Sequence, residues 1–129
     1  MIIDASALLA ILLAEEDAPS FAEAIDQTHE PAMSAVNYLE TAIRVDRLDN
    51  VLLNQKFDAF MMLSGIAVQP VSLSQTKIAR LAYAEFGKGR HRAGLNFGDC
   101  FAYALAKQHG LPLLFKGDDF IHTDIESAT

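Results

Sequence analysis

The chain has 129 residues, 51% of them hydrophobic and 21% charged, which is enough to bury the core of one folded domain and excludes a disordered tail. Seventeen acidic residues oppose ten basic ones, and the formal charge of -7 argues against a basic protein that coats nucleic acid. The only cysteine, Cys100, excludes an internal disulfide or a zinc cluster built on cysteines and fits a reducing compartment.

The first segment, Met1–Asp4, predicts a short buried strand that ends on a carboxylate. Ser6 is placed to cap a helix that runs to about Glu15. The apolar run in this helix, Ala5–Ala14, is far shorter than the roughly 20 residues that cross a membrane. It also lacks the basic segment and cleavage site of a secretory signal, so we expect a cytoplasmic protein without membrane contact.

The middle of the chain alternates short strands with helices. Capping residues and apolar spacing predict helices from Asp17 or Ser20 to about Gln27, from Ser34 to about Asp49 and from Asn50 to Ser64, and strands at 31–33 and 66–71. In the helix that Ser34 begins, we expect Val36, Leu39, Ile43 and Val45 to face inward.

The last third follows the same pattern. Ser74 is expected to cap a helix that runs to about Phe86, and residues 87–98, which hold four of the seven glycines, are expected to form a flexible loop. A helix is predicted from Asp99 to Gly110, where the glycine ends it. Strands are predicted at 112–115 and 123–125. This alternation predicts one α/β domain over residues 1–129, with a mostly parallel sheet between helices. Because the helical share is high, an all-α bundle is the alternative.

Several carboxylates fall where parallel sheets place their ligands. Asp4 and Asp118 each follow an apolar strand, and ligands bind just beyond the carboxyl ends of such strands. Glu40 lies four residues after Val36 and three before Ile43, on the apolar side of its helix. A buried carboxylate needs a partner or a metal, so these positions are candidates for chemistry.

Each of the remaining acids also has a structural explanation. Asp99, in the first turn of its helix, is typical of a cap or a partner of the helix dipole, and Gly117-Asp118-Asp119 is typical of a plain turn. If one fold gathers these carboxylates, they cannot all ionise side by side without compensation. Mg²⁺ prefers oxygen ligands, polarises a phosphoryl oxygen and activates water, which indicates phosphodiester hydrolysis.

Four stretches, Met1–Leu9, Ser34–Glu40, Leu95–Ala106 and Leu113–Phe120, resemble the PIN-domain ribonucleases and, more closely, the VapC toxins of bacterial toxin–antitoxin pairs. The resemblance extends in order over essentially the whole chain. It implies a three-layer sandwich with a central, mostly parallel sheet of four or five short strands flanked by helices. It also implies an endoribonuclease that depends on Mg²⁺, or on Mn²⁺ in its place.

The resemblance assigns roles residue by residue. The metal-site and catalytic acids correspond to Asp4, Glu40 and Asp99, and the small hydroxyl near the first acid, on the substrate side, corresponds to Ser6. The fourth acid corresponds to Asp118, which is nearer the strand end, or to Asp119, which directly precedes Phe120. Asp118 is slightly preferred because of its position.

The same resemblance implies partners. It indicates a VapB-type antitoxin with a basic residue that blocks the metal site, and a homodimer that forms a heterotetramer or larger complex with it. The region Ser34–Ser64 is a candidate dimer contact. The apolar surface of Ala5–Ala14 is either core or a groove for an antitoxin helix.

An acidic ribonuclease must still hold a polyanion. Lys88, Arg90 and Arg92 lie with His91 in the glycine-rich loop before Asp99, where they either contact RNA phosphates or form a solvated surface. We expect Arg90 and Arg92 to bind substrate, and Cys100 to pack as a small apolar residue.

Two other functions compete with RNA cleavage. A non-catalytic module can use the same acids to capture a basic partner peptide, and Mg²⁺-dependent cleavage would separate the two. A phosphoryl-accepting regulator that uses Asp4 or Asp118 ranks lower. It lacks a well-placed lysine after the last strand, because Lys116 precedes Asp118 and Asp119.

Overall fold

The structure is a computed structural model that describes all residues, 1–129. A parallel sheet of four strands runs through it in the order β3-β2-β1-β4. The strands are β1 (Ile2–Ile3), β2 (Ala32–Ser34), β3 (Ala67–Gln69) and β4 (Leu113–Leu114). The predicted α/β architecture is therefore confirmed, and the alternative of an all-α bundle is wrong.

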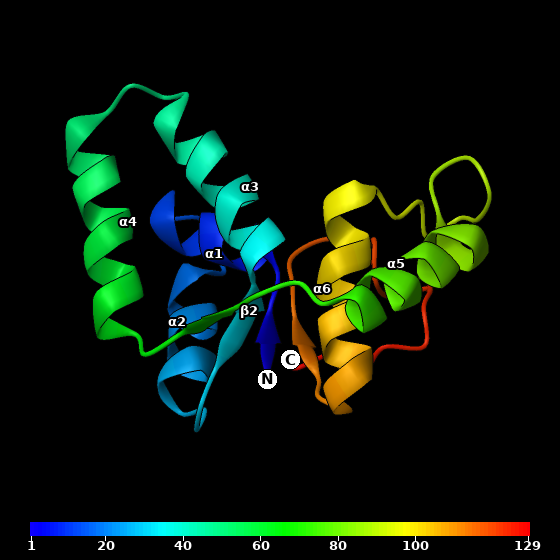
Figure 1. Ribbon diagram of the computed structural model, residues 1–129. Coiled ribbons are helices and arrows are strands. Elements are labelled where there is room, and N and C mark those ends of the chain that lie inside the picture. The colour runs from blue at the N-terminus through cyan, green and yellow to red at the C-terminus, as the bar shows by residue number, and fades with distance from the viewer.

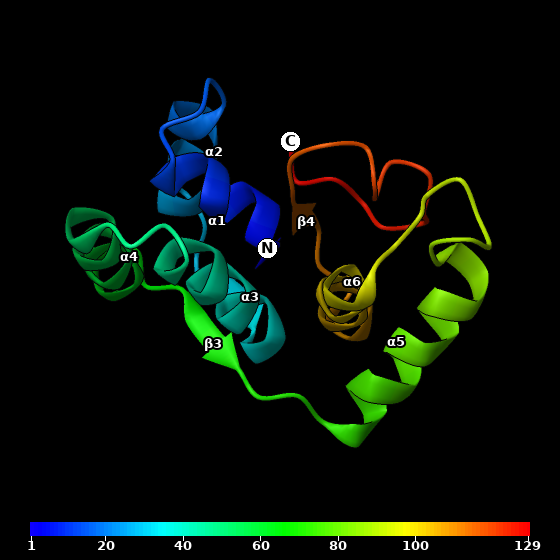
Figure 2. The same ribbon diagram turned by 90° about the horizontal axis from the view of Figure 1, so that it is seen from above.

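Six helices cover the two faces of this sheet. They are α1 (Ala5–Leu12), α2 (Ala18–Asp26), α3 (Ala35–Asp46), α4 (Val51–Leu63), α5 (Leu73–Phe86) and α6 (Phe97–His109). Figures 1 and 2 show α1–α4 on one side of the sheet and α5 and α6 on the other.

The neighbouring strands β1 and β4 contribute side chains to two separate cores, because successive side chains of a strand point to opposite faces. Ile2 and Leu113 pack with residues of α5 and α6. Ile3 and Leu114 pack with residues of α1, α2 and α4. All four residues of these two strands are therefore buried, and this burial stabilises strands of only two residues.

Most predicted helix starts are confirmed, with three corrections. Ser34 and Asn50 cap α3 and α4 through their side chains. Asp4 caps α1 in place of Ser6, Ser72 caps α5 in place of Ser74, and Asn96 caps α6, which is predicted to begin at Asp99. A cap residue must be extended while its side chain accepts from a helical N–H, and in each case the residue that meets this condition stands two or three positions earlier.

The predicted strand at 123–125 is not formed. An isolated bridge forms just after this segment, between Ser127 and Leu113. Asp124 instead accepts hydrogen bonds from Tyr103 and Lys107 of α6. Its side chain therefore ties the C-terminal segment to α6.

The inward face predicted for α3 is confirmed at Val45 and wrong at Leu39 and Ile43. Leu39 is 57% exposed and Ile43 48%, whereas Asn37, Thr41 and Val45 are the buried residues of this helix. Asn37 can be buried because its Nδ2 donates to Gly98 O at 3.0 Å, and Thr41 Oγ1 donates to Asn37 O at 2.8 Å. Hydrogen bonds that satisfy buried polar groups thus turn the apolar stripe of α3 outward.

The apolar run of α1 is mainly core. Six of the eight residues of α1 are buried, whereas Leu13, just beyond the helix, is 40% exposed and Ala14 is exposed as well. A groove for an antitoxin helix at this exposed end of the run stays a prediction. No helix combines the length and apolar character needed to span a membrane.

Candidate functional site

Asp4 stands at the carboxyl end of β1, where it is buried and caps α1. Its Oδ2 accepts hydrogen bonds from Ser6 N at 3.0 Å and from Ser6 Oγ at 2.6 Å. Its Oδ1 is buried and has no hydrogen-bond partner. Burial raises the pKa of the Asp4 carboxyl, opposed by the Ser6 hydrogen bonds and reinforced by the negative charge of Asp119.

Ser6 joins two strand ends. Its hydroxyl donates to Asp4 and accepts from Lys116 N, which follows β4, at 3.0 Å. Both interactions fix the position of Asp4 relative to the turn that carries Asp118 and Asp119.

Asp99 belongs to the acidic cluster, and Asn96, not Asp99, is the cap of its helix. Asp99 is the third residue of α6 and forms a capping box with Asn96: Asn96 N donates to Asp99 Oδ2 at 3.0 Å, and Asp99 N donates to Asn96 Oδ1 at 2.9 Å. Burial raises the pKa of Asp99 to about 7, with the Asn96 hydrogen bond opposing and the charges of Asp4, Asp119 and Glu40 adding to the shift.

Glu40 reaches the cluster from α3. Asn37 Nδ2 donates to its Oε1 at 3.4 Å. Partial burial raises the pKa of Glu40, as does the charge of Asp4, while Asn37 and the cation Arg44 oppose the shift. Gly98 makes this approach of α3 and α6 possible, because a Cβ atom at position 98 would lie 2.8 Å from Glu40 Cδ.

The two candidates for the fourth acid differ in their effect on the cluster. Asp119 is among the main charges that raise the pKa of both Asp4 and Asp99, and Asp118 is among those of neither. Coulomb interactions weaken with distance, so the charge of Asp119 is the nearer one. Asp118 and Asp119 are both exposed, and of the two only the charge of Asp119 acts on Asp4 and Asp99.

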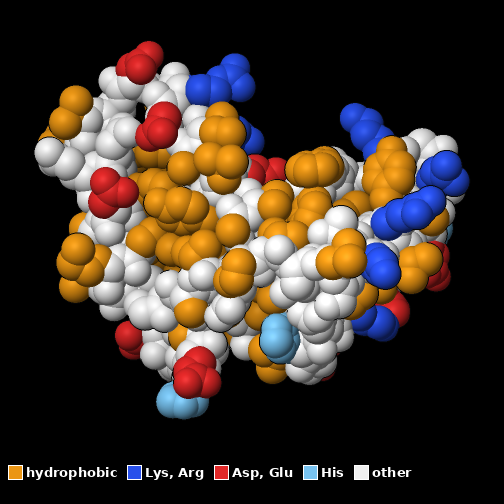
Figure 3. Space-filling model, viewed as in Figure 1, with side chains coloured by type: hydrophobic (Ala, Val, Ile, Leu, Met, Phe, Trp, Pro, Cys, Tyr) orange, Lys and Arg blue, Asp and Glu red, His pale blue; other side chains and the backbone are white.

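The acids form an open cluster. No three His, Cys, Asp or Glu side chains are close enough together to enclose a metal ion. Figure 3 shows acidic atoms at the base of a notch between α3 and α6, with Lys and Arg atoms above it on both sides. Mg²⁺ is commonly held by one or two carboxylates and keeps several waters, so an open set of carboxylates with one unpartnered buried oxygen fits a hard divalent cation.

The predicted basic loop lies beside this notch. Lys88, Arg90 and Arg92 are exposed, and His91 is held by a hydrogen bond from Ala93 N to its Nδ1 at 3.0 Å. None of the three cations forms an ion pair in the structure. Their contact with RNA stays a prediction.

Cys100, beside Asp99, packs as predicted. It is 4% exposed, and burial raises the pKa of its thiol to about 11, helped by the charge of Asp99. The thiol therefore stays protonated and unreactive near neutral pH.

Sequence reasoning missed three residues that shape the site. Asn37 orients Glu40, Asn96 orients Asp99, and Gly98 lets the two acids approach each other. The spacing of Asn96 to Asp99 is that of a capping box, which is a signal available in the sequence. The tertiary contact of Gly98 with Glu40 has no comparable signal.

Comparison with known proteins identifies the family. The PIN domain family matches residues 1–126. Ribonuclease VapC30 of Mycobacterium tuberculosis (strain H37Rv) is 47% identical over 128 residues, which cover 99% of this chain and 98% of that protein. Ribonuclease VapC of Mycolicibacterium smegmatis is also 47% identical, over 99% of both chains. This chain belongs to the VapC ribonucleases of the PIN-domain family.

Solved structures support the fold of this VapC-family chain. The VapC20 toxin of Mycobacterium tuberculosis, described as cleaving the sarcin-ricin loop, superposes with a TM-score of 0.76 at 13% identity, over 96% of this chain and 95% of that one. A chain of a toxin–antitoxin complex from Klebsiella pneumoniae gives a TM-score of 0.72 at 18% identity, over 95% and 92%. The predicted PIN-like sandwich is thereby confirmed.

Proposed function

We propose that this VapC-family chain is a Mg²⁺-dependent endoribonuclease, the toxin of a type II toxin–antitoxin pair, with Mn²⁺ able to replace Mg²⁺. The observation that carries the proposal is that Asp4, Glu40 and Asp99 lie near enough for burial and their mutual repulsion to raise the pKa of each, with the charge of Asp119 acting on Asp4 and Asp99. Their charge is not neutralised by a buried lysine or arginine. A divalent cation would supply the missing compensation.

The acids of the notch have different proposed roles. Asp4, through its unpartnered Oδ1, and Asp99 would hold the metal directly, with Glu40 and Asp119 completing the set of oxygens. When bound, the metal would polarise the scissile phosphodiester and make water a better nucleophile. Glu40, half-buried at the edge of the notch, would orient the attacking water.

Two assignments differ from the first expectation. We place the fourth acid at Asp119 instead of Asp118, because Asp119 is the one whose charge acts on Asp4 and Asp99. For Ser6 we propose a positioning role, because its hydroxyl is already engaged with Asp4 and Lys116 N.

The proposal includes partners and location. The substrate is RNA in the cytoplasm, and Arg90 and Arg92 contact phosphates beside the cleaved bond. A VapB-type antitoxin inserts a basic side chain into the acidic notch. The chain forms a homodimer, within a heterotetramer or larger complex, with its contact in the region Ser34–Ser64.

A metal titration tests the proposed requirement for a divalent cation. Protein stripped with a chelator should leave labelled RNA intact, and added Mg²⁺ or Mn²⁺ should restore cleavage in a saturable way. Cleavage that persists in chelator would contradict the metal requirement. An intact fold that binds basic peptide but cleaves no RNA under any metal would favour the non-catalytic binding module instead.

A further inference from the structure

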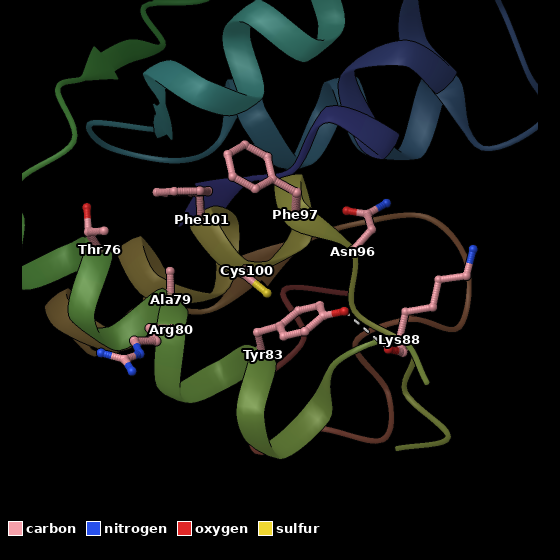
Figure 4. Close-up of a pocket in the computed structure, with 9 residues that line it drawn as sticks. All are labelled: Thr76, Ala79, Arg80, Tyr83, Lys88, Asn96, Phe97, Cys100 and Phe101. Carbon is pink, nitrogen blue, oxygen red and sulfur yellow. Dashed lines mark hydrogen bonds between the residues drawn. The ribbon is translucent and has the colours of Figure 1, made fainter. Parts of the chain in front are cut away.

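An open pocket of about 580 Å³ lies between α5 and α6, outside the acidic cluster (Figure 4). Its walls come from both helices and from the glycine-rich loop. The lining residues are Thr76, Ala79, Arg80, Tyr83, Lys88, Asn96, Phe97, Cys100 and Phe101. The volume is in the range of pockets that hold small molecules or parts of larger ligands.

The walls of this pocket are mainly aromatic and apolar. Figure 4 shows Phe97 and Phe101 on the same side of α6, and Tyr83 across from the Cys100 thiol. The rings of Phe97 and Phe101 meet edge to face at 5.1 Å between centroids. Phe97 is 73% exposed, so a large flat apolar surface faces solvent at the first residue of α6.

One end of the pocket is polar and leads to the acidic cluster. Lys88 and Asn96 lie at this end (Figure 4), and Tyr83 Oη donates to Lys88 O at 3.3 Å. Asn96 is the residue whose backbone N–H holds the Asp99 carboxylate. Phe97 also lines the shallow groove that contains Glu40 and Arg44. A polymeric ligand that crosses the acidic notch therefore reaches this pocket next.

The charge of the pocket differs from that of the whole protein. The protein carries a formal charge of -7, yet the only charged residues that line this pocket are Arg80 and Lys88. Neither takes part in any of the three ion pairs. Cations beside exposed aromatic faces suit a ligand that is polyanionic and carries flat rings, which favours single-stranded nucleic acid over an apolar peptide helix.

We propose that the pocket between α5 and α6 binds an unstacked base of single-stranded RNA, with Phe97 as its stacking surface and Lys88 on the adjoining phosphate. This inference rests on the proposed function, because it places the base next to the bond that the acidic cluster would cleave. It makes the pocket a determinant of which RNA sites are cut. Base-paired RNA cannot supply such a base, so the enzyme should favour single-stranded segments.

Binding measurements on an Asp99→Asn background test the proposal without cleavage. The probe is a short fluorescent single-stranded RNA of mixed sequence, and an RNA duplex of equal length is the comparison. Phe97→Ala removes the stacking surface, Lys88→Ala removes the cation, and Thr76→Trp fills the pocket from an exposed position of α5. Leu81→Ala and Lys77→Ala are matched controls on α5, because both residues are exposed and neither lines the pocket.

We expect Phe97→Ala and Thr76→Trp each to weaken binding of the single-stranded RNA by roughly tenfold, which is the effect of losing one stacked base. Lys88→Ala should weaken binding less and should reduce the salt dependence of binding. The controls and the duplex should change by less than about twofold.

Unchanged single-strand binding in Phe97→Ala and Thr76→Trp would overturn the inference, even if the unsubstituted protein cleaves RNA. A smaller molecular mass in solution for either variant would also overturn it, because the pocket would then be a protein interface. Failure of the unsubstituted protein to cleave any RNA would instead remove the proposed function.

Discussion

The molecule contains two groups of acidic residues that differ in how their charge is compensated. Asp124 accepts from Lys107 Nζ and from Tyr103 Oη, each at 2.6 Å, and these partners lower its pKa. In the notch, burial raises the pKa of Asp4, Glu40 and Asp99. Acids with partners from the same chain stabilise the fold, and acids left without them mark the place where an external cation or substrate acts.

Replacing one acid of each group by its amide distinguishes the two groups most clearly. We expect Asp99→Asn to lower RNA cleavage by roughly 10²–10³-fold or more, because it removes a charge that the metal needs, while the capping box can persist. Asp124→Asn should leave cleavage nearly unchanged and cost about 1 kcal/mol of stability. The measurement is the initial cleavage rate at saturating Mg²⁺, with urea unfolding of both variants. Equal activity in the two variants would remove the distinction.

A second pair of amides distinguishes the neighbouring acids after β4. Asp119→Asn should reduce cleavage by roughly 10²-fold, because its charge acts on Asp4 and Asp99. Asp118→Asn should reduce it by less than about threefold, since its charge is not among the main ones acting on either acid. The reverse order would restore Asp118 as the fourth acid.

Gly98 connects the notch to the fold. Gly98→Ala places a methyl group against the Glu40 carboxylate, which is the flexible end of its side chain and can move aside. We therefore expect cleavage to fall roughly 10- to 100-fold with little loss of stability, because a small misplacement of a reacting group is costly. In a Glu40→Ala background the same substitution should have no further effect on the cleavage rate. An additive loss there would show that Gly98 acts through something other than Glu40.

The pKa of Asp99, about 7 against an ordinary value of 3.8, predicts how stability changes with pH in chelator. Between these two values the folded state binds more protons than the unfolded state, so the free energy of unfolding should fall as pH rises from about 4 to 7. Asp99→Asn should reduce this fall, to which Asp4 and Glu40 also contribute, and its gain in stability over the unsubstituted protein should be larger at pH 8 than at pH 4, by on the order of 2 kcal/mol. Urea unfolding at the two pH values measures this. An equal gain at both would mean that burial of the charge is not the cause.

The smallest effect is expected from the exposed loop. Arg90→Ala combined with Arg92→Ala should weaken RNA binding by a few-fold and reduce the salt dependence of binding, because counterions are released by fewer phosphate contacts. Lys77→Ala with Arg47→Ala, an equal loss of charge on other exposed surfaces, is the control. An unchanged salt slope in the loop variant would leave these arginines as solvated surface.

The fold followed from local signals in the sequence. Short apolar strands ending on Asp4 and before Lys116, with Ser34, Asn50 and Gly110 at helix ends, were enough to predict the parallel sheet and its helices. The orientation of α3 was not predictable in this way. Its apolar stripe is exposed, and the buried face is polar because Asn37 and Thr41 find partners that only the folded chain provides.

For the candidate site, the sequence predicts the types of residue involved but not how they are arranged. Asp4, Glu40 and Asp99 were identified from strand ends, helix spacing and family resemblance. The choice between Asp118 and Asp119 depends on the path of a turn, and the contact of Gly98 with Glu40 depends on how closely α3 and α6 approach. Both are tertiary properties, to which helix spacing and strand patterns are not sensitive.

Direct titration of Mn²⁺, followed by its paramagnetic resonance signal at pH 8, tests most directly whether the acids of the notch share one divalent ion. We expect a saturable site in the unsubstituted protein and in Asp124→Asn, and its loss in Asp99→Asn and in Asp4→Asn. Undiminished Mn²⁺ binding in the last two variants would contradict the proposed metal centre.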